Sequence, residues 1–262
     1  MNQRIKIETE TGYIIAETEN CLFCPNKVQT IAIIAHGLAG YKEEPMLQCL
    51  KNCFLKHGIS VFMYDAQHSL GESSGSLSEA CFSGFIADLN CVMSWIKQHL
   101  KINSFLLAGH SLGAGACLHY AAEHPTEIKG VISLSAVYNG YLLRESYLTN
   151  KPEFMAEWQQ KKLIYREHPN QPDKNGYISI RHLDDALQYA VEKDVYTIKS
   201  PVLILCGDHD VSSTIAINEK LRDSFSGNAT LQIIENCGHT YSKAQNQKDL
   251  IDFVSKWITL YL

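Results

Sequence analysis

The sequence of 262 residues lacks the features that mark several classes of protein. It has no run of roughly 18 apolar residues, the length that a membrane-spanning helix needs. Its first residues, "MNQRIKIETE", contain no apolar stretch of the kind found in a secretory signal. It also has no long basic run, and its net charge is −5. We therefore expect neither a membrane nor a nucleic acid as a partner, and a cytoplasmic location.

Motifs that bind cofactors or metals are missing as well. There is no G-x-x-x-x-G-K-[ST] phosphate loop, and Gly109, Gly113 and Gly115 do not have the G-x-G-x-x-G spacing of dinucleotide-binding folds. Cys21 and Cys24 form one C-x-x-C pair, but no second pair completes a zinc site. The nine cysteines are scattered, and their odd number is typical of a reduced protein. We expect no cofactor and no metal.

The sequence does contain a regular alternation of short apolar runs and helical patterns. Two N-terminal runs, "RIKIETE" and "GYIIAETE", predict an opening β-hairpin. Later runs predict buried strands: "TIAIIAHG", "ISVFMYD", "SFLLAGH", "GVISLSA", "PVLILCG" and "TLQIIEN". This alternation predicts an α/β fold, with a mostly parallel sheet of about eight strands and helices on both faces. Functional loops are then expected at the carboxyl ends of the strands.

Residues 137–199 interrupt this alternation, because a crossover between two strands needs far less chain. The segment carries seven of the thirteen tyrosines, and its apolar spacing predicts one helix around Phe154 and Trp158 and another from 183 to 191. We predict a helical lid here, inserted after the sixth strand, whose aromatic side chains wall an apolar pocket. The alternative is a structural insertion that does not contact substrate.

This interpretation divides the chain into two parts. Residues 1–136 and 200–262 form the core domain, and residues 137–199 form the lid. No internal repeat or low-complexity tract suggests any further division.

The stretch "GHSLG", residues 109–113, fits the pattern G-x-S-x-G and lies between a predicted strand and a predicted helix. In this context Ser111 sits on a tight turn with its hydroxyl exposed, and flanking glycines let two backbones approach. The start of the helix presents unpaired N–H groups, so the Leu112 N–H is a candidate donor to a developing negative charge. The alternative is an ordinary serine in a glycine-rich turn.

A serine nucleophile needs a base, and the base needs an acid. His239 is the candidate base among eleven histidines because it follows Gly238 just beyond the last predicted strand. The stretch "GDHD" offers two acids after a strand, and we favour Asp210 over Asp208, which we expect to shape the turn. The order serine, acid, histidine is the one used on this kind of sheet. We expect the turn to point His110 away from the site.

The loop "HGLAG", residues 36–40, follows the first buried strand. Its glycines allow the backbone to turn so that the Leu38 N–H faces the nucleophile as a second oxyanion donor. His36 is expected to make structural hydrogen bonds rather than to take part in catalysis.

Five stretches resemble the α/β-hydrolase fold superfamily, and the likeness extends over nearly the whole chain: "AHGLAGYKE", "VFMYDAQHSLGESSG", "LAGHSLGAGA", "PVLILCGDHD" and "CGH". They are most similar to the serine-esterase branch that holds cinnamoyl and feruloyl esterases, monoacylglycerol-lipase-like enzymes and serine aminopeptidase-type hydrolases. The resemblance implies that the backbone N–H groups of Leu38 and Leu112 form the oxyanion hole. It also implies that an insertion such as residues 137–199 builds much of the acyl or aryl pocket.

We therefore expect a serine hydrolase that cleaves small or medium acyl esters, or aryl esters, of low molecular mass. Ser111 attacks the carbonyl, His239 transfers protons, Asp210 orients His239, and an acyl-enzyme intermediate forms. Two alternatives stay open. One is a thioesterase or amidase with the same triad, and the other is a ligand receptor on the same fold with slow or no turnover.

Overall fold

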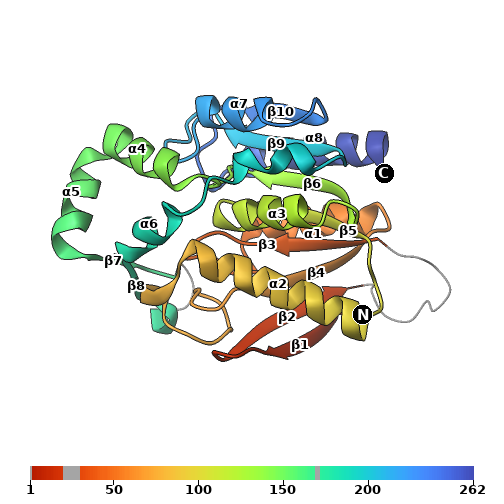
Figure 1. Cartoon of the computed structure of the whole chain (residues 1–262), viewed down its shortest axis with the longest axis horizontal. Helices are drawn as coiled ribbons and strands as arrows, with labels where there is room; N and C mark the ends of the chain where they lie inside the picture. The colour runs from red at the N-terminus through yellow and green to blue at the C-terminus, as the bar shows by residue number, and fades with distance from the viewer. Residues whose placement is uncertain (1, 20–29, 169–171) are drawn as a thin grey trace.

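The computed structural model describes residues 2–19, 30–168 and 172–262. Cys21 and Cys24 lie outside these residues. The main feature is one eight-stranded sheet with the strand order β1-β2-β4-β3-β5-β6-β9-β10 (Figure 1). Its strands are β1 (Asn2–Glu8), β2 (Tyr13–Glu19), β3 (Ile31–Ala35), β4 (Ser60–Asp65), β5 (Phe105–His110), β6 (Ile128–Leu134), β9 (Val202–Gly207) and β10 (Ala229–Ile234).

The predicted N-terminal hairpin is confirmed, since β1 and β2 pair antiparallel, and β2 also pairs antiparallel with β4. Every other neighbouring pair in the sheet is parallel. The prediction of a mostly parallel sheet of about eight strands is therefore correct. Because the carboxyl ends of parallel strands meet at one edge, the loops after β3, β5, β9 and β10 converge there.

Helices cover both faces of the sheet (Figure 1). The main helices are α1 (Pro45–Lys56), α2 (Phe82–His99), α3 (Leu112–Glu123), α7 (Ile215–Asp223) and α8 (Ala244–Tyr261), and a short helix η1 (Leu77–Glu79) precedes α2. Side chains of α2, α3 and α7 share one buried cluster, and those of α1 and α8 share the other. Within β3, Ile33 belongs to the first cluster and Ile34 to the second, as the two-residue period of a strand requires.

The helix α7 was not predicted, although its start carries a local signal. The Thr214 hydroxyl caps the helix by accepting the Ile217 N–H. Only two side chains of this nine-residue helix, Asn218 and Leu221, are buried. Such a thin apolar stripe is too weak to stand out in the sequence.

The segment between β6 and β9 contains α4 (Gly140–Asn150), α5 (Pro152–Lys161), β7 (Leu163–Arg166), η2 (Pro172–Lys174), β8 (Gly176–Ser179), α6 (Arg181–Ala186), η3 (Val191–Lys193) and η4 (Val195–Thr197). The predicted helix around Phe154 is confirmed as α5. The second predicted helix is shorter than expected, because α6 ends at Ala186 and the apolar residues that follow lie in turns and in η3. The hairpin of β7 and β8 was not predicted.

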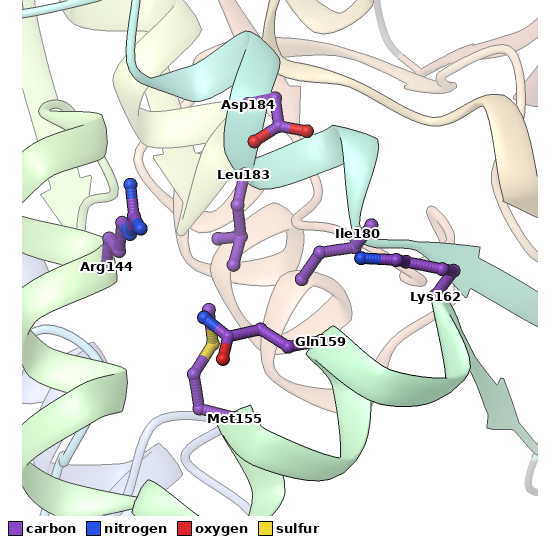
Figure 2. Close-up of a pocket in the computed structure, with 7 residues that line it drawn as sticks. All are labelled: Arg144, Met155, Gln159, Lys162, Ile180, Leu183 and Asp184. Carbon is purple, nitrogen blue, oxygen red and sulfur yellow. The ribbon is translucent and has the colours of Figure 1, made fainter.

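We call residues 137–199 the insertion. Its helices α4, α5 and α6 and its hairpin lie beyond the carboxyl edge of the sheet, at left in Figure 1, and η3 and η4 return along α3. Its helices α4, α5 and α6 surround a pocket of about 290 Å³ (Figure 2). The side chains that line this pocket are Arg144, Met155, Gln159, Lys162, Ile180, Leu183 and Asp184. None of the helices in the described residues is long and apolar enough to cross a membrane.

Candidate active site

Ser111 lies at the junction of β5 and α3 in a strained backbone conformation. Its φ of 54° and ψ of −117° place it in a region that side-chain-bearing residues rarely occupy, at a cost of about 1–3 kcal/mol. Hydrogen bonds on both sides hold this turn, because the Ser111 N–H donates to Leu134 O at 2.9 Å and its carbonyl accepts the Val137 N–H at 3.0 Å. The serine is thus fixed at the carboxyl edge of the sheet.

The two glycines of the motif are required by close backbone approaches. A Cβ added at Gly109 would lie 2.5 Å from Gly113 O, and a Cβ added at Gly113 would collide with the carbonyl oxygens of Ala35 and His36. The strand that carries the loop of residues 36–40 therefore packs directly against the serine turn. This contact needs both positions to lack a side chain.

His239 and Asp210 complete a chain of hydrogen bonds that begins at Ser111. The His239 Nε2 lies 3.0 Å from Ser111 Oγ, and its Nδ1 lies 2.7 Å from Asp210 Oδ2. A carboxylate only accepts, so Nδ1 carries the proton and Nε2 is free to accept the serine proton. The three residues that the sequence singled out as nucleophile, base and acid are therefore brought together by loops after β5, β9 and β10.

Asp210 is buried and its second oxygen is also satisfied. Oδ1 accepts the N–H groups of Ser212 and Ser213 at 2.8 and 2.9 Å. Burial acts to raise the pKa of Asp210, but the hydrogen bond and the charge of His239, together with these two N–H groups, outweigh burial and lower the pKa. The carboxyl group is therefore ionised at neutral pH.

Asp208 has a different position from Asp210. Its Oδ1 accepts the Cys237 N–H at 3.0 Å, which joins the turn after β9 to the loop that carries His239. This hydrogen bond lowers the pKa of Asp208. The geometry fits the turn-shaping role that the sequence suggested for Asp208, with Asp210 as the acid beside the imidazole.

The loop of residues 36–40 lies against Ser111. A Cβ added at Gly37 would be 2.9 Å from Ser111 Cβ. In the described part of the chain, the N–H groups of Leu38 and Leu112 have no hydrogen-bond partner. His36 supports the loop, because its Nδ1 donates to Gly37 O at 2.7 Å and its Nε2 accepts the Ala66 N–H at 2.8 Å.

A buried ion pair, which was not predicted from the sequence, fixes the other end of this loop. Lys42 and Asp65 are both almost fully buried, with Nζ 2.9 Å from Oδ2. Burial disfavours the ammonium, but Asp65, Glu43 and Glu72 outweigh burial and raise the pKa of Lys42. Glu17, Glu43 and Glu72 are spaced closely enough to hold a cation, but the Lys42 ammonium already contacts all three. The cluster is therefore structural.

His110 is not turned away from the site, so that expectation was wrong. Its Nε2 donates to the backbone oxygen of His239 at 2.9 Å, and the two ring centroids are 4.9 Å apart. Burial lowers the pKa of His110 to about 3, with a further contribution from the charge of His239. His110 is therefore neutral and supports the loop of the candidate base. The turn itself forms as predicted, but the hydrogen-bond partner of His110 is His239, which lies 129 positions further along the chain.

The insertion contacts the loops on both sides of the triad. From α4, the Ser146 hydroxyl donates to Val211 O at 2.6 Å, next to Asp210. Beyond β7, the His168 ring packs on Tyr41 with 4.3 Å between centroids, close to the loop of Leu38. The pocket in Figure 2 is a separate feature, since neither triad nor loop residues line it.

The seven tyrosines of the insertion do not act together as one wall. Four of them are exposed: Tyr141, Tyr165, Tyr177 and Tyr196. Tyr147 packs with Phe154 and Trp158, with ring centroids 5.7–6.3 Å apart, and Tyr165 and Tyr177 form a separate pair at 5.1 Å. Tyrosine content alone was therefore a poor guide to which aromatic side chains meet.

Comparison with known proteins places the chain in a family. Residues 26–243 match the family described as serine aminopeptidase, S33. A search of curated protein sequences finds no match. Among solved structures, Est1E from Butyrivibrio proteoclasticus with bound ferulic acid has a TM-score of 0.77 and 19% identity, over 98% of each chain. Mouse alpha/beta hydrolase domain-containing protein 10 has a TM-score of 0.74 and 16% identity, again over 98% of each chain.

A third similar structure is the esterase domain of a Rhodothermus marinus protein, with a TM-score of 0.69 and 17% identity over 100% of this chain and 99% of that one. At such identities these likenesses establish the fold, and the family match establishes the relationship. Because that match covers most of the chain, the protein belongs to the serine aminopeptidase S33 family of α/β-hydrolases and is a hydrolase.

Proposed function

We propose that the protein cleaves carboxylic esters with Ser111 as nucleophile, His239 as general base and acid, and Asp210 as the orienting acid. One observation carries the proposal: the continuous chain from Ser111 Oγ to His239 at 3.0 Å and from His239 to Asp210 at 2.7 Å. A buried, ionised carboxylate, an imidazole in the correct tautomer and a hydroxyl on a strained turn are what acyl transfer needs.

The reaction proceeds in two halves. Ser111 Oγ attacks the ester carbonyl while His239 Nε2 takes its proton, and the charged imidazole is stabilised by Asp210. The unpaired N–H groups of Leu38 and Leu112 donate to the oxyanion, where negative charge develops. His239 then protonates the leaving alcohol, the acyl-enzyme remains, and water attacks it with His239 again as base.

The proposed substrates are small or medium acyl esters, or aryl esters, and the insertion is proposed to act as a lid over them. Its contacts to Val211 and Tyr41 support a position across the triad. The aromatic group of Tyr147, Phe154 and Trp158 offers an apolar surface for an acyl or aryl part. Similar folds include one solved with ferulic acid, which is an aromatic acid.

The test is hydrolysis of 4-nitrophenyl esters from acetate to palmitate by the wild type and by Ser111→Ala. We expect a preference for short or medium chains and a loss of at least ~10³-fold in kcat for the variant. Ser226→Ala, an exposed serine, is the matched control and should retain full activity. A fluorophosphonate probe should label the wild type and not Ser111→Ala. Equal hydrolysis by the wild type and Ser111→Ala would refute the assignment.

Two measurements separate the esterase from the alternatives: the rates for substrates with different scissile bonds, and the time course of product release. A thioester or an aminoacyl 4-nitroanilide would use the same apparatus, so kcat/KM for matched ester, thioester and amide ranks the three. The family description includes aminopeptidases, which makes the anilide a necessary substrate in this comparison. A ligand receptor would give one slow burst and then a stable adduct, whereas an esterase turns over many times.

A further inference from the structure

Two cations of the insertion meet at one pair of aromatic rings. Lys151 lies at the junction of α4 and α5, and its Nζ is 5.5 Å from the centroid of the Tyr147 ring. Arg166 ends β7, and its Cζ is 5.7 Å from the centroid of the Phe154 ring. These two rings are themselves 6.0 Å apart. The segments that carry the two cations are thus joined through the rings.

Neither cation has an acidic partner. Among the described residues no carboxylate forms an ion pair with Lys151 or Arg166, and the residues outside the described ranges contain no Asp or Glu. The neighbouring Lys161, by contrast, is paired with Glu157 at 2.7 Å. Lys151 is also half-buried. Burial and the charge of Arg166 lower its pKa, and only Asp210 of the triad opposes them.

The pair lies between the two loops that flank the triad. Just before Lys151, the side chains of Ser146 and Asn150 both donate to Val211 O, which follows Asp210. Two residues after Arg166, the chain packs on Tyr41 beside the loop of Leu38. Lys151 is therefore close enough for the charge of Asp210 to act on it, and both cations lie in segments that contact the loops beside the triad.

We propose that Lys151 and Arg166 form a carboxylate-binding subsite of the active site, which selects esters whose acyl part ends in a second, ionised carboxyl group. The inference rests on the proposed esterase function. Two unpaired cations can give such a carboxylate charge-assisted hydrogen bonds, and Arg166 offers the planar fork that suits it. The rings of Tyr147 and Phe154 supply an apolar surface for the spacer between the ester and the carboxylate.

The test compares 4-nitrophenyl hexanoate with the mono-4-nitrophenyl ester of adipic acid, which has the same chain length and a terminal carboxylate. For the wild type we expect a higher kcat/KM for the adipate. In Lys151→Gln/Arg166→Gln the adipate-to-hexanoate ratio should fall about tenfold, mainly through the KM of the adipate. Raising the salt concentration from roughly 0.02 to 0.5 M should reduce the wild-type ratio, since exposed charges are screened.

Two controls isolate the charge of the subsite. Lys161→Gln removes a cation from the same insertion and should leave the ratio unchanged, and Lys151→Arg keeps the charge and should keep the preference. Melting temperatures of all variants exclude unfolding as a cause. Hydrolysis of hexanoate with no preference for adipate, or an unchanged ratio in the double variant, overturns the subsite alone. No hydrolysis of either ester together with no fluorophosphonate labelling of Ser111 overturns the proposed function instead.

Discussion

Replacing the Asp210 carboxylate by an amide should remove most of the activity while leaving the fold intact. In Asp210→Asn one amide oxygen can still accept the N–H groups of Ser212 and Ser213. The amide nitrogen then faces His239 Nδ1 and donates to it, so the imidazole must carry its proton on Nε2. An Nε2–H cannot accept the proton of Ser111, and the base is lost.

The magnitude follows from the distance between the imidazole and the carboxylate. When His239 is protonated, two unit charges 2.7 Å apart attract by about 6 kcal/mol at an effective dielectric constant of about 20. This attraction is absent with Asn. At 1.36 kcal/mol per tenfold, the loss in kcat is roughly 10⁴-fold. The assay is kcat for 4-nitrophenyl butyrate, with the rate of fluorophosphonate labelling as a second readout.

Asp208→Asn is the matched control, because it makes the same chemical change two residues away. Asn can still accept the Cys237 N–H, so we expect a loss of less than about tenfold in kcat. If Asp208→Asn were the more damaging change, or if Asp210→Asn kept a tenth of the wild-type activity, the assignment of the acid would be wrong. A fall in melting temperature large enough to explain the loss would also refute this reasoning.

Two further predictions concern buried titratable groups. His110→Gln can keep an N–H donor toward His239 O, so this variant should retain most of the wild-type kcat. His110→Leu cannot, and its kcat should fall about tenfold or more with KM little changed. An equal loss of kcat in both variants would refute a hydrogen-bonding role for His110. Burial raises the pKa of Asp88 to about 7, against about 3.9 when unfolded. Because the folded state holds this proton more tightly, the free energy of unfolding should fall as the pH rises from about 4 to 7. Asp88→Asn should lack this pH dependence. If urea unfolding gave the same pH profile for both proteins, the raised pKa of Asp88 would be wrong.

The sequence predicted those features that depend on neighbouring residues. Apolar runs such as "PVLILCG" form buried strands whatever lies beside them, and the turn at Ser111 follows from its glycines and from the strand before it. The hairpin of β7 and β8 escaped prediction because Leu163, Tyr165 and Tyr177 are exposed, so neither strand shows an alternation of buried and exposed positions. Strands of only four residues also offer too few positions for a clear periodic signal.

Contacts between charged residues far apart in the sequence could not be predicted, for a different reason. Lys42 and Asp65 are 23 positions apart, and nothing in either local sequence shows that the lysine is almost fully buried. Lys151 and Arg166 lie in a segment with many charges of both signs, where the ordinary expectation is an exposed cation with a nearby acid. That these two lack such a partner is a property of the fold, because only the arrangement of α4, α5 and β7 decides which charges meet.

The choice of one base among the histidines near Ser111 shows how hydrogen bonds, rather than residue type, assign chemistry. His36 gives its Nδ1 proton to a backbone carbonyl and uses Nε2 to accept a backbone N–H, so both nitrogens are occupied. His110 must carry its proton on Nε2, since it donates to a carbonyl there. His239 differs from both, because Asp210 holds its proton on Nδ1 and its Nε2 lone pair is directed at the Ser111 hydroxyl. Three imidazoles of equal intrinsic basicity thus become two structural supports and one candidate base, because each has a different set of partners.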